Sequence, residues 1–167
     1  MKKWVWAEFS SLDRDYLVKI QDDVQNQLRG PRFSIHLSLA GPFVDIEQSA
    51  IEHVRDYCSE NDSLSVRTKG YEHSDVYFQS FYIAIDKSEK LENLRYKMFE
   101  INKQHSTEIF YPHISLAYGN HPSHIKEDLL SRLSKPKDNL VIDKIAIVDI
   151  HENISLWHTS NSFLFSN

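Results

Sequence analysis

Apolar residues along this chain recur in two rhythms, one typical of strands and one typical of helices. Alternating or continuous apolar runs, rich in Val, Ile, Phe and Tyr, predict β-strands. Gly41-Pro42 is expected to end one of them, and Asp75 lies in the polar connection between two others that we expect to pair antiparallel. The predicted strands cover residues 4–9, 33–40, 64–71, 76–86, 110–118, 139–149 and 154–165.

Helical spacing, with apolar residues three or four positions apart, fills the segments between these strands. Ser10-Ser11 can cap the first helix, which Gly30-Pro31 ends, and Ser88 can cap the third. The order of elements occurs twice, which predicts an internal duplication: one domain, residues 1–167, made of two pseudo-symmetric lobes that share one active-site cleft. The apolar positions of the predicted helices are Leu12, Tyr16, Ile20, Val24 and Leu28; Ile51, Val54 and Cys58; Leu91, Leu94, Met98 and Ile101; and Ile125, Leu129 and Leu133.

One short word occurs in both halves of the chain. It reads His36-Leu37-Ser38-Leu39-Ala40 in the first half and His113-Ile114-Ser115-Leu116-Ala117 in the second. Because successive side chains of a strand point to opposite faces, the histidine and the serine of each word share one face. Two such strands can direct two imidazoles and two hydroxyls into one cleft. These groups can accept a proton, donate a proton and bind phosphoryl oxygens, which indicates metal-free acid/base chemistry on a phosphate.

Core packing is the plainer interpretation of either word, since a single histidine on a strand is more often a hydrogen-bonded structural residue. The repetition argues against it. Burying His and Ser costs free energy unless each finds a hydrogen-bond partner, so packing gives no reason to place them in the same register twice. We therefore expect both words to face one site.

Charge and cysteine content narrow the function classes. The chain has 19 Lys and Arg against 24 Asp and Glu, a formal net charge of −5, which favours a small nucleotide over a long nucleic acid as partner. Cys58 is the only cysteine, which excludes an intramolecular disulfide and favours a reducing compartment. The N-terminal segment reaches Glu8 before a long apolar run develops, and no segment approaches a membrane span. We expect a cytoplasmic protein without membrane contacts.

The two His-x-Ser words make the chain resemble the 2H phosphoesterase superfamily, which is named for two His-x-Ser/Thr motifs. Within that superfamily the chain resembles the cyclic phosphodiesterase group. Serine stands in the first motif where threonine is often found, which keeps the hydroxyl. Other segments resemble the same group: Gly30-Pro31-Arg32-Phe33, Tyr77-Phe78-Gln79-Ser80 with the apolar run 81–85, Tyr111-Pro112 before the second word, Tyr118 after it, and the late segments 145–148 and 156–157.

The resemblance implies an α+β fold in which two antiparallel sheets flank a central cleft and the helices lie outside. It implies His36 and His113 as the acid/base pair, without deciding which is the base. Ser38 and Ser115 become the phosphate-binding hydroxyls, and Tyr118 a further phosphate or water contact. The implied reaction is water attack on ADP-ribose 1″,2″-cyclic phosphate or a nucleoside 2′,3′-cyclic phosphate, which gives a phosphomonoester with no metal and no cofactor.

Several other residues are candidates for contacts with substrate. Tyr77, Phe78 and Tyr111 can stack on a base or ribose, with core packing as the alternative. Gln79 can orient a phosphate or a water, or simply satisfy a strand edge.

Candidates for a countercharge or a metal are weaker. Arg32 and Arg67 could pair with phosphate, although each also fits a solvated surface position. His121 and His124 are spaced for a metal, but no third ligand lies nearby in sequence, so we expect no metal site.

Two other functions stay open at this point. One is a 2′,5′-phosphodiesterase or RNA end-processing activity, similar to the 2′-5′ RNA ligase-like branch of the superfamily, with short RNA ends as partner. The other is a nucleotide-binding module that does not catalyse. The main expectation is a monomeric enzyme that binds a small nucleotide or ADP-ribose cyclic phosphate, with its physiological substrate undetermined.

Overall fold

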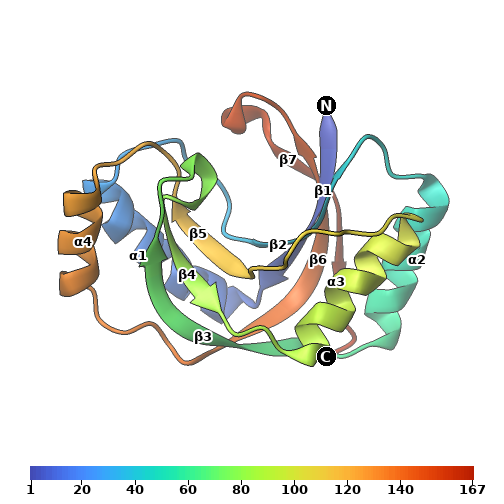
Figure 1. Ribbon diagram of the computed structural model, residues 1–167. Coiled ribbons are helices and arrows are strands. Elements are labelled where there is room, and N and C mark those ends of the chain that lie inside the picture. The colour runs from blue at the N-terminus through green and yellow to red at the C-terminus, as the bar shows by residue number, and fades with distance from the viewer.

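A computed structural model describes residues 1–167 and contains one curved antiparallel sheet with two groups of helices on its outer side (Figure 1). Two short 3-10 turns, η1 (Tyr77–Gln79) and η2 (Ile154–Leu156), precede β4 and β7. None of the helices is long and apolar enough to cross a membrane. The strands are β1 (Lys2–Phe9), β2 (Leu37–Phe43), β3 (Leu64–His73), β4 (Phe81–Ile85), β5 (His113–Ala117), β6 (Asn139–Ile150) and β7 (His158–Leu164); the helices are α1 (Ser11–Gln27), α2 (Gln48–Glu60), α3 (Glu89–Ile101) and α4 (Ser123–Arg132).

The strands are ordered β1-β2-β5-β4-β3-β6-β7, and β1 also pairs with β6. The two antiparallel sheets expected from the sequence are two halves of a single sheet. Strand β6 joins them. It is 12 residues long, pairs with β3 through its first residues and with β1 from Ile142 to Ile150, and so belongs to both halves. The fold class expected from the sequence, α+β with antiparallel strands and outer helices, is confirmed.

The helices cover the convex side of the sheet in two groups. Helix α1 packs against β5, β1 and α4, whereas α2 and α3 pack against each other and against β7 and β2 (Figure 1). Between helices and sheet lies one hydrophobic core of 33 buried residues. The second cluster of buried apolar residues is much smaller and consists of Trp6, Ala146 and Val148, on the opposite, concave face. This face is therefore left free for a site.

Helix α1 buries most of the stripe that apolar spacing predicts, with Val24 and Leu28 fully buried and Tyr16 and Ile20 partly buried, but its first turn differs. Leu12 is 77% exposed, whereas the polar residues Asp13 and Gln21 are buried in line with Leu17. Each polar residue has a partner: Asp13 Oδ2 accepts a hydrogen bond of 2.7 Å from the Val141 N–H, and Gln21 Nε2 donates one of 3.2 Å to the Phe33 carbonyl. Satisfied polar groups can be buried at small cost, and apolar periodicity does not detect them.

Four predicted strands begin later in the structure, including the one predicted over 110–118, which starts at His113. The strand predicted over 33–40 begins after His36 and continues through Gly41-Pro42 to Phe43. Gly41 has φ +135° and a Cβ there would lie 2.8 Å from the Trp4 ring, so glycine lets the strand bend close to Trp4 instead of ending it. The segments predicted as strands over 76–86 and 154–165 begin with the turns η1 and η2.

Candidate active site

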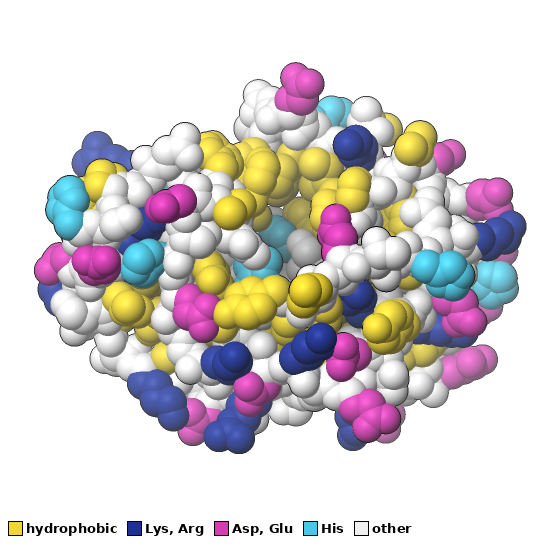
Figure 2. Space-filling view, viewed as in Figure 1, with side chains coloured by type: hydrophobic (Ala, Val, Ile, Leu, Met, Phe, Trp, Pro, Cys, Tyr) yellow, Lys and Arg dark blue, Asp and Glu magenta, His cyan; other side chains and the backbone are white.

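The concave face of the sheet holds a pocket of about 420 Å³. In the space-filling view it is a hollow framed by apolar side chains, with histidine at its bottom (Figure 2). Most of the site residues expected from the sequence line it: His36, Ser38, Phe78, Gln79, His113, Ser115 and Tyr118. Tyr77 does not. Its ring is 39% exposed and contacts the edge of Phe78 instead.

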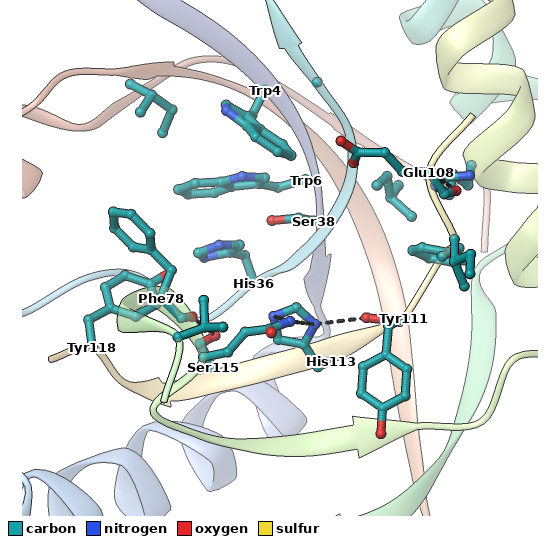
Figure 3. Close-up of a pocket in the computed structure, with 18 of the residues that line it drawn as sticks. Trp4, Trp6, His36, Ser38, Phe78, Glu108, Tyr111, His113, Ser115 and Tyr118 are labelled. Atoms are coloured by element: carbon teal, nitrogen blue, oxygen red, sulfur yellow. Dashed lines mark hydrogen bonds between the residues drawn. The ribbon is translucent and has the colours of Figure 1, made fainter. Parts of the chain in front are cut away.

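The two words meet because β2 and β5 are antiparallel neighbours with Leu37 opposite Ile114. Continuing this register sets His36 across from Ser115 and Ser38 across from His113. Leu37 and Ile114 point into the core on the other face, where both are fully buried. Side chains opposite each other in such a pair have Cβ atoms about 5 Å apart, so the register gathers two imidazoles and two hydroxyls in one place (Figure 3).

Both histidines are held in the same way by their own backbone. The Nδ1 atom of His36 lies 2.7 Å from the Ser34 carbonyl oxygen, and Nδ1 of His113 lies 2.8 Å from the Tyr111 carbonyl oxygen. A carbonyl can only accept, so Nδ1 carries the proton in each neutral ring and Nε2 keeps its lone pair. Each imidazole therefore offers Nε2 as a base when neutral and as an acid when protonated.

His36 is the more buried of the pair. Its ring is stacked on Trp6, with centroids 3.5 Å apart and planes 7° from parallel, and the residue is 7% exposed. Burial lowers the pKa of His36 to about 4, the Ser34 carbonyl opposes this by raising it, and the neighbouring His113 lowers it further. His36 is consequently neutral at neutral pH.

His113 contacts Gln79 and Tyr82. The Gln79 side-chain nitrogen lies 3.2 Å from both ring nitrogens of His113, and the Tyr82 ring meets the imidazole edge to face. Burial lowers the pKa of His113 from its usual value, and the hydrogen bond to the Tyr111 carbonyl raises it. This shift has the same direction as that of His36.

The two serines are not equivalent in the pocket. The Ser115 hydroxyl donates a hydrogen bond of 2.8 Å to the Phe78 carbonyl, so its proton is already engaged. Ser38 lines the pocket between the levels of Trp6 and His36 (Figure 3). Tyr118 is buried, its ring stacks on Phe33 at 3.7 Å, and burial raises its pKa. Its hydroxyl is protonated at neutral pH, as that of any tyrosine with a pKa near 10 or above, and remains a donor.

Three tryptophans line the pocket, and they are all the tryptophans of the chain. Trp4 and Trp6 lie on one face of β1, two residues apart, and Trp157 contacts the edges of Trp6 and Tyr118. Sequence reasoning used Trp4 only as part of a strand and missed all three as site residues. The alternating strand positions of Trp4 and Trp6 were the available signal.

Arg95 and Glu108 also line the pocket and were missed. Sequence patterns gave no signal for Arg95, because it lies on α3 between the apolar positions that identified that helix. The two arginines considered as countercharges lie elsewhere: Arg32 pairs with Asp22, and Arg67 lies 3.8 Å from Asp86, both on the exposed surface.

The two histidines considered for a metal have other surroundings. His121 bridges two elements, with Nδ1 2.7 Å from the Ser80 hydroxyl and Nε2 2.7 Å from the Arg29 carbonyl oxygen. His124 lies in the first turn of α4 and is exposed. Tyr111, considered for stacking, lines the pocket and donates a hydrogen bond of 2.5 Å to Glu72.

Comparisons with known proteins agree with this arrangement. The model of the 2'-5' RNA ligase superfamily matches residues 17–153. No curated protein matches the chain. Among solved structures, TT0787 of Thermus thermophilus is similar with a TM-score of 0.65 and 15% identity, and E. coli LigT in apo form with 0.66 and 9%; each comparison covers 99% of this chain and 98% of the other. At these identities the structures show a shared fold.

The family model spans most of the chain and both words, and the resemblance to the 2H phosphoesterase superfamily is confirmed. Membership supports phosphodiester hydrolysis or ligation in general, without selecting the cyclic phosphodiesterase group. The chain belongs to the 2'-5' RNA ligase superfamily.

Proposed function

We propose that the protein hydrolyses a cyclic phosphodiester to a phosphomonoester by two-histidine acid/base catalysis that needs no metal. The substrate class is ADP-ribose 1″,2″-cyclic phosphate or a nucleoside 2′,3′-cyclic phosphate. The observation that supports this most directly is the matched pair of imidazoles on one pocket, each with Nδ1–H bound to the carbonyl two residues before it. Both Nε2 atoms are thereby set for proton transfer.

His36 is the general base of this proposal and His113 the general acid. His36 has the stronger cause for staying neutral, because it is more buried and the pKa of its ring is lowered to about 4. Its Nε2 takes a proton from water as the water oxygen bonds to phosphorus. The bond from phosphorus to one ribose oxygen breaks, and protonated His113 gives its Nε2 proton to that oxygen. An anionic substrate favours the imidazolium of His113 by charge attraction.

Two hydroxyls contribute donors to the phosphoryl oxygens. Ser38 lines the pocket on the same strand face as His36, and the Tyr118 hydroxyl is protonated at neutral pH because a tyrosine pKa lies near 10 and burial raises it further. Ser115 acts mainly by holding η1 in place, because its hydroxyl donates a hydrogen bond to the Phe78 carbonyl. Donors aimed at phosphoryl oxygens in a pocket stabilise the charge that develops there during attack.

The walls of the pocket suit a nucleoside. Trp4, Trp6, Phe78 and Trp157 present aromatic surface, and stacking of a base on such a ring contributes about 1 to 3 kcal/mol. E. coli LigT, which shares the fold, has been solved in complex with ATP, with NADP+ and with 3'-AMP. These complexes support a small nucleotide as the ligand class here.

The proposal is tested by measuring hydrolysis in EDTA of adenosine 2′,3′-cyclic phosphate, ADP-ribose 1″,2″-cyclic phosphate and a linear 2′-5′ linked oligoadenylate. We expect one of the cyclic compounds to be opened at least 100-fold more efficiently than the oligoadenylate. Cleavage of the oligoadenylate alone would replace the proposal with the 2′,5′-phosphodiesterase alternative. Binding of all three without turnover would indicate the non-catalytic module.

The roles of the histidines have their own test. We expect His36→Ala and His113→Ala each to lower kcat by about 100- to 10,000-fold, the range for loss of a general acid or base. His124→Ala serves as the matched control, because His124 is exposed and lies on α4. Full activity in either of the first two variants, with an unchanged circular dichroism spectrum, refutes the assignment.

A further inference from the structure

Arg95 occupies an unusual place for a charged side chain. It projects from α3, is 6% exposed, and lines the same pocket as the two histidines. No other lysine or arginine lines this pocket. The mechanism proposed above does not use it.

Burial of Arg95 is not balanced by any carboxylate. Of the four buried residues that carry Asp, Glu, Lys or Arg side chains, the other three have a partner of opposite charge: Asp13 with Lys137, Lys126 with Asp75, and Asp149 with Lys3. Arg95 forms no ion pair. A buried charge without a counterion is costly, so a site that keeps one calls for an explanation.

The contacts of Arg95 are all with neutral groups. Nη2 donates hydrogen bonds to the Ser106 hydroxyl at 2.7 Å and to the Glu108 carbonyl oxygen at 3.4 Å. The guanidinium carbon lies 5.1 Å from the ring centroid of Phe99 and 4.7 Å from that of Phe110. The two rings and the two hydrogen bonds fix the plane of the guanidinium, which pre-orders it for a ligand.

Part of the guanidinium is still available. Arginine has five N–H donors, and the hydrogen bonds described above use only those of Nη2. The other two nitrogens, Nε and Nη1, have no hydrogen-bond partner within the protein, and the residue lines the pocket. Free, pre-oriented guanidinium donors match phosphoryl oxygens in a bidentate way.

Arg95 is also close enough to the histidines for one small ligand. Phe110, on whose ring Arg95 lies, precedes His113 by three residues, so their Cα atoms are separated by at most about 10 Å even in a fully extended chain. Glu108 is the one acidic residue that lines the pocket, and its carboxylate faces it as well (Figure 3). Its negative charge opposes an anion at Arg95 and suits a hydroxyl or amino donor of the ligand.

We propose that Arg95 binds a second phosphoryl group of the substrate, so that the substrate class is a cyclic phosphodiester nucleotide that bears another phosphate or a pyrophosphate beyond its ribose. This proposal rests on the proposed function and narrows its substrate. The second phosphate is the counterion of Arg95, which has no carboxylate partner within the protein.

The test compares kcat/KM for adenosine 2′,3′-cyclic phosphate with and without a 5′-phosphate. We expect the wild-type protein to prefer the 5′-phosphorylated compound by 10-fold or more, and Arg95→Met to bring that ratio close to one. Arg95→Lys should retain part of this preference for the 5′-phosphorylated compound, because lysine keeps the positive charge but cannot form two parallel hydrogen bonds to a phosphate. Glu108→Gln should increase the ratio, because it removes the opposing charge. ADP-ribose 1″,2″-cyclic phosphate forms a parallel arm that shows whether a pyrophosphate binds in the same way.

A ratio between substrates separates this role from a structural one. If Arg95 only supports α3 and the loop at Ser106, Arg95→Met lowers both rates together and leaves the ratio unchanged, which overturns the proposal. Hydrolysis of both compounds at equal efficiency by the wild-type protein also overturns it, while the proposed function stands.

Binding supplies a readout that does not depend on turnover. Titration calorimetry with adenosine 3′,5′-bisphosphate and adenosine 3′-monophosphate should give at least 10-fold tighter binding of the bisphosphate to the wild-type protein and no such difference in Arg95→Met. Equal affinities in the wild type contradict the second phosphate site even if no cyclic phosphate is hydrolysed.

Discussion

At the scale of single residues, the carbonyl groups of Ser34 and Tyr111 decide how the two histidines can act. Each accepts a hydrogen bond from Nδ1–H of its histidine, so that Nε2 carries the lone pair of the neutral ring. The rings nevertheless differ in environment, because His36 is covered by a parallel Trp6 ring whereas His113 meets Tyr82 edge to face and contacts the Gln79 amide. Equal tethering with unequal burial makes His36 the harder of the two imidazoles to protonate.

This difference predicts an acidic optimum for kcat/KM. His36 must be neutral, so activity rises as the pH increases through its pKa of about 4. His113 must be protonated, so activity falls as the pH increases through a pKa that burial has lowered below the usual value of about 6.5. The profile of kcat should fall at higher pH than that of kcat/KM, because bound anionic substrate favours the imidazolium. A profile that is flat between pH 4 and 7 contradicts this pair of roles.

Trp6→Ala tests the cause of the low pKa. Without the stacked ring, water reaches His36, its pKa rises towards about 6.5, and the acidic limb of the kcat/KM profile moves to higher pH. Trp4→Ala is the matched control, because Trp4 lines the pocket without stacking on His36. An acidic limb that stays in place in Trp6→Ala means that burial by this ring is not what keeps His36 neutral.

At the scale of elements, the turn η1 (Tyr77–Gln79) is held in place by contacts from other parts of the chain. The carbonyl of Tyr77 accepts from Gly119 N–H at 2.9 Å, that of Phe78 from the Ser115 hydroxyl at 2.8 Å, and that of Gln79 from the Ser74 hydroxyl at 2.8 Å. Strand pairing is not needed to satisfy these groups, which explains why the predicted strand 76–86 starts only at Phe81. As a result, η1 places Phe78 and Gln79 at the pocket.

Buried Lys126 of α4 anchors this turn from behind. Its Nζ donates to the Ser74 carbonyl at 2.6 Å, and the Ser74 hydroxyl holds Gln79, whose amide contacts His113. We expect Lys126→Met to lower kcat about 10-fold with little change in KM, because His113 loses its positioned neighbour. Gln79→Ala should have a similar effect, and the double variant should be no worse than either alone if both act through one chain of contacts.

Lys135→Met is the control for that series, since Lys135 pairs with Asp138 on the exposed surface. Additive losses in the double variant, or equal losses in the control, show that Lys126 supports the fold in general and does not position Gln79. Thermal unfolding of each variant separates lost stability from lost positioning.

At the scale of the whole molecule, burial of the site contributes to how stability depends on pH. The pKa of His36 is about 4 in the folded protein and about 6.5 in an unfolded chain, so between these values the unfolded chain binds a proton that the folded protein does not. The free energy of unfolding therefore falls as the pH is lowered from about 6.5 to 4. A shift of this size corresponds to about 3 kcal/mol.

His36→Gln isolates this contribution. The variant has no imidazole at this position, so its free energy of unfolding, measured in urea at pH 7, 5 and 4, should fall less on acidification than that of the wild type. Other groups that titrate in this range are common to both proteins and cancel in the comparison. Equal losses in the two proteins are inconsistent with a neutral, buried His36.

Much of the molecule could be predicted from local pattern, and the failures come from contacts with residues distant in the chain. Apolar spacing identified every helix, and both serine caps, Ser10 and Ser88, were correct. It failed where polar residues are buried with partners, as at Asp13, and where glycine carries a strand through a bend, as at Gly41. The duplication into two related lobes, the monomeric state and the cytoplasmic location stay predictions.

The sequence by itself determined which polar groups share a face, because the histidine and the serine of a His-x-Ser word in an extended segment lie on the same side wherever that segment lies. Only the tertiary structure decided how those groups differ. The register of β2 against β5, the Trp6 ring on His36 and the Arg95 side chain without a carboxylate depend on contacts between residues far apart in the chain. Burial sets the proton affinity of a histidine, and ion pairing sets whether a buried charge is balanced. Neither can be read from neighbouring residues in the sequence, because both depend on the tertiary structure.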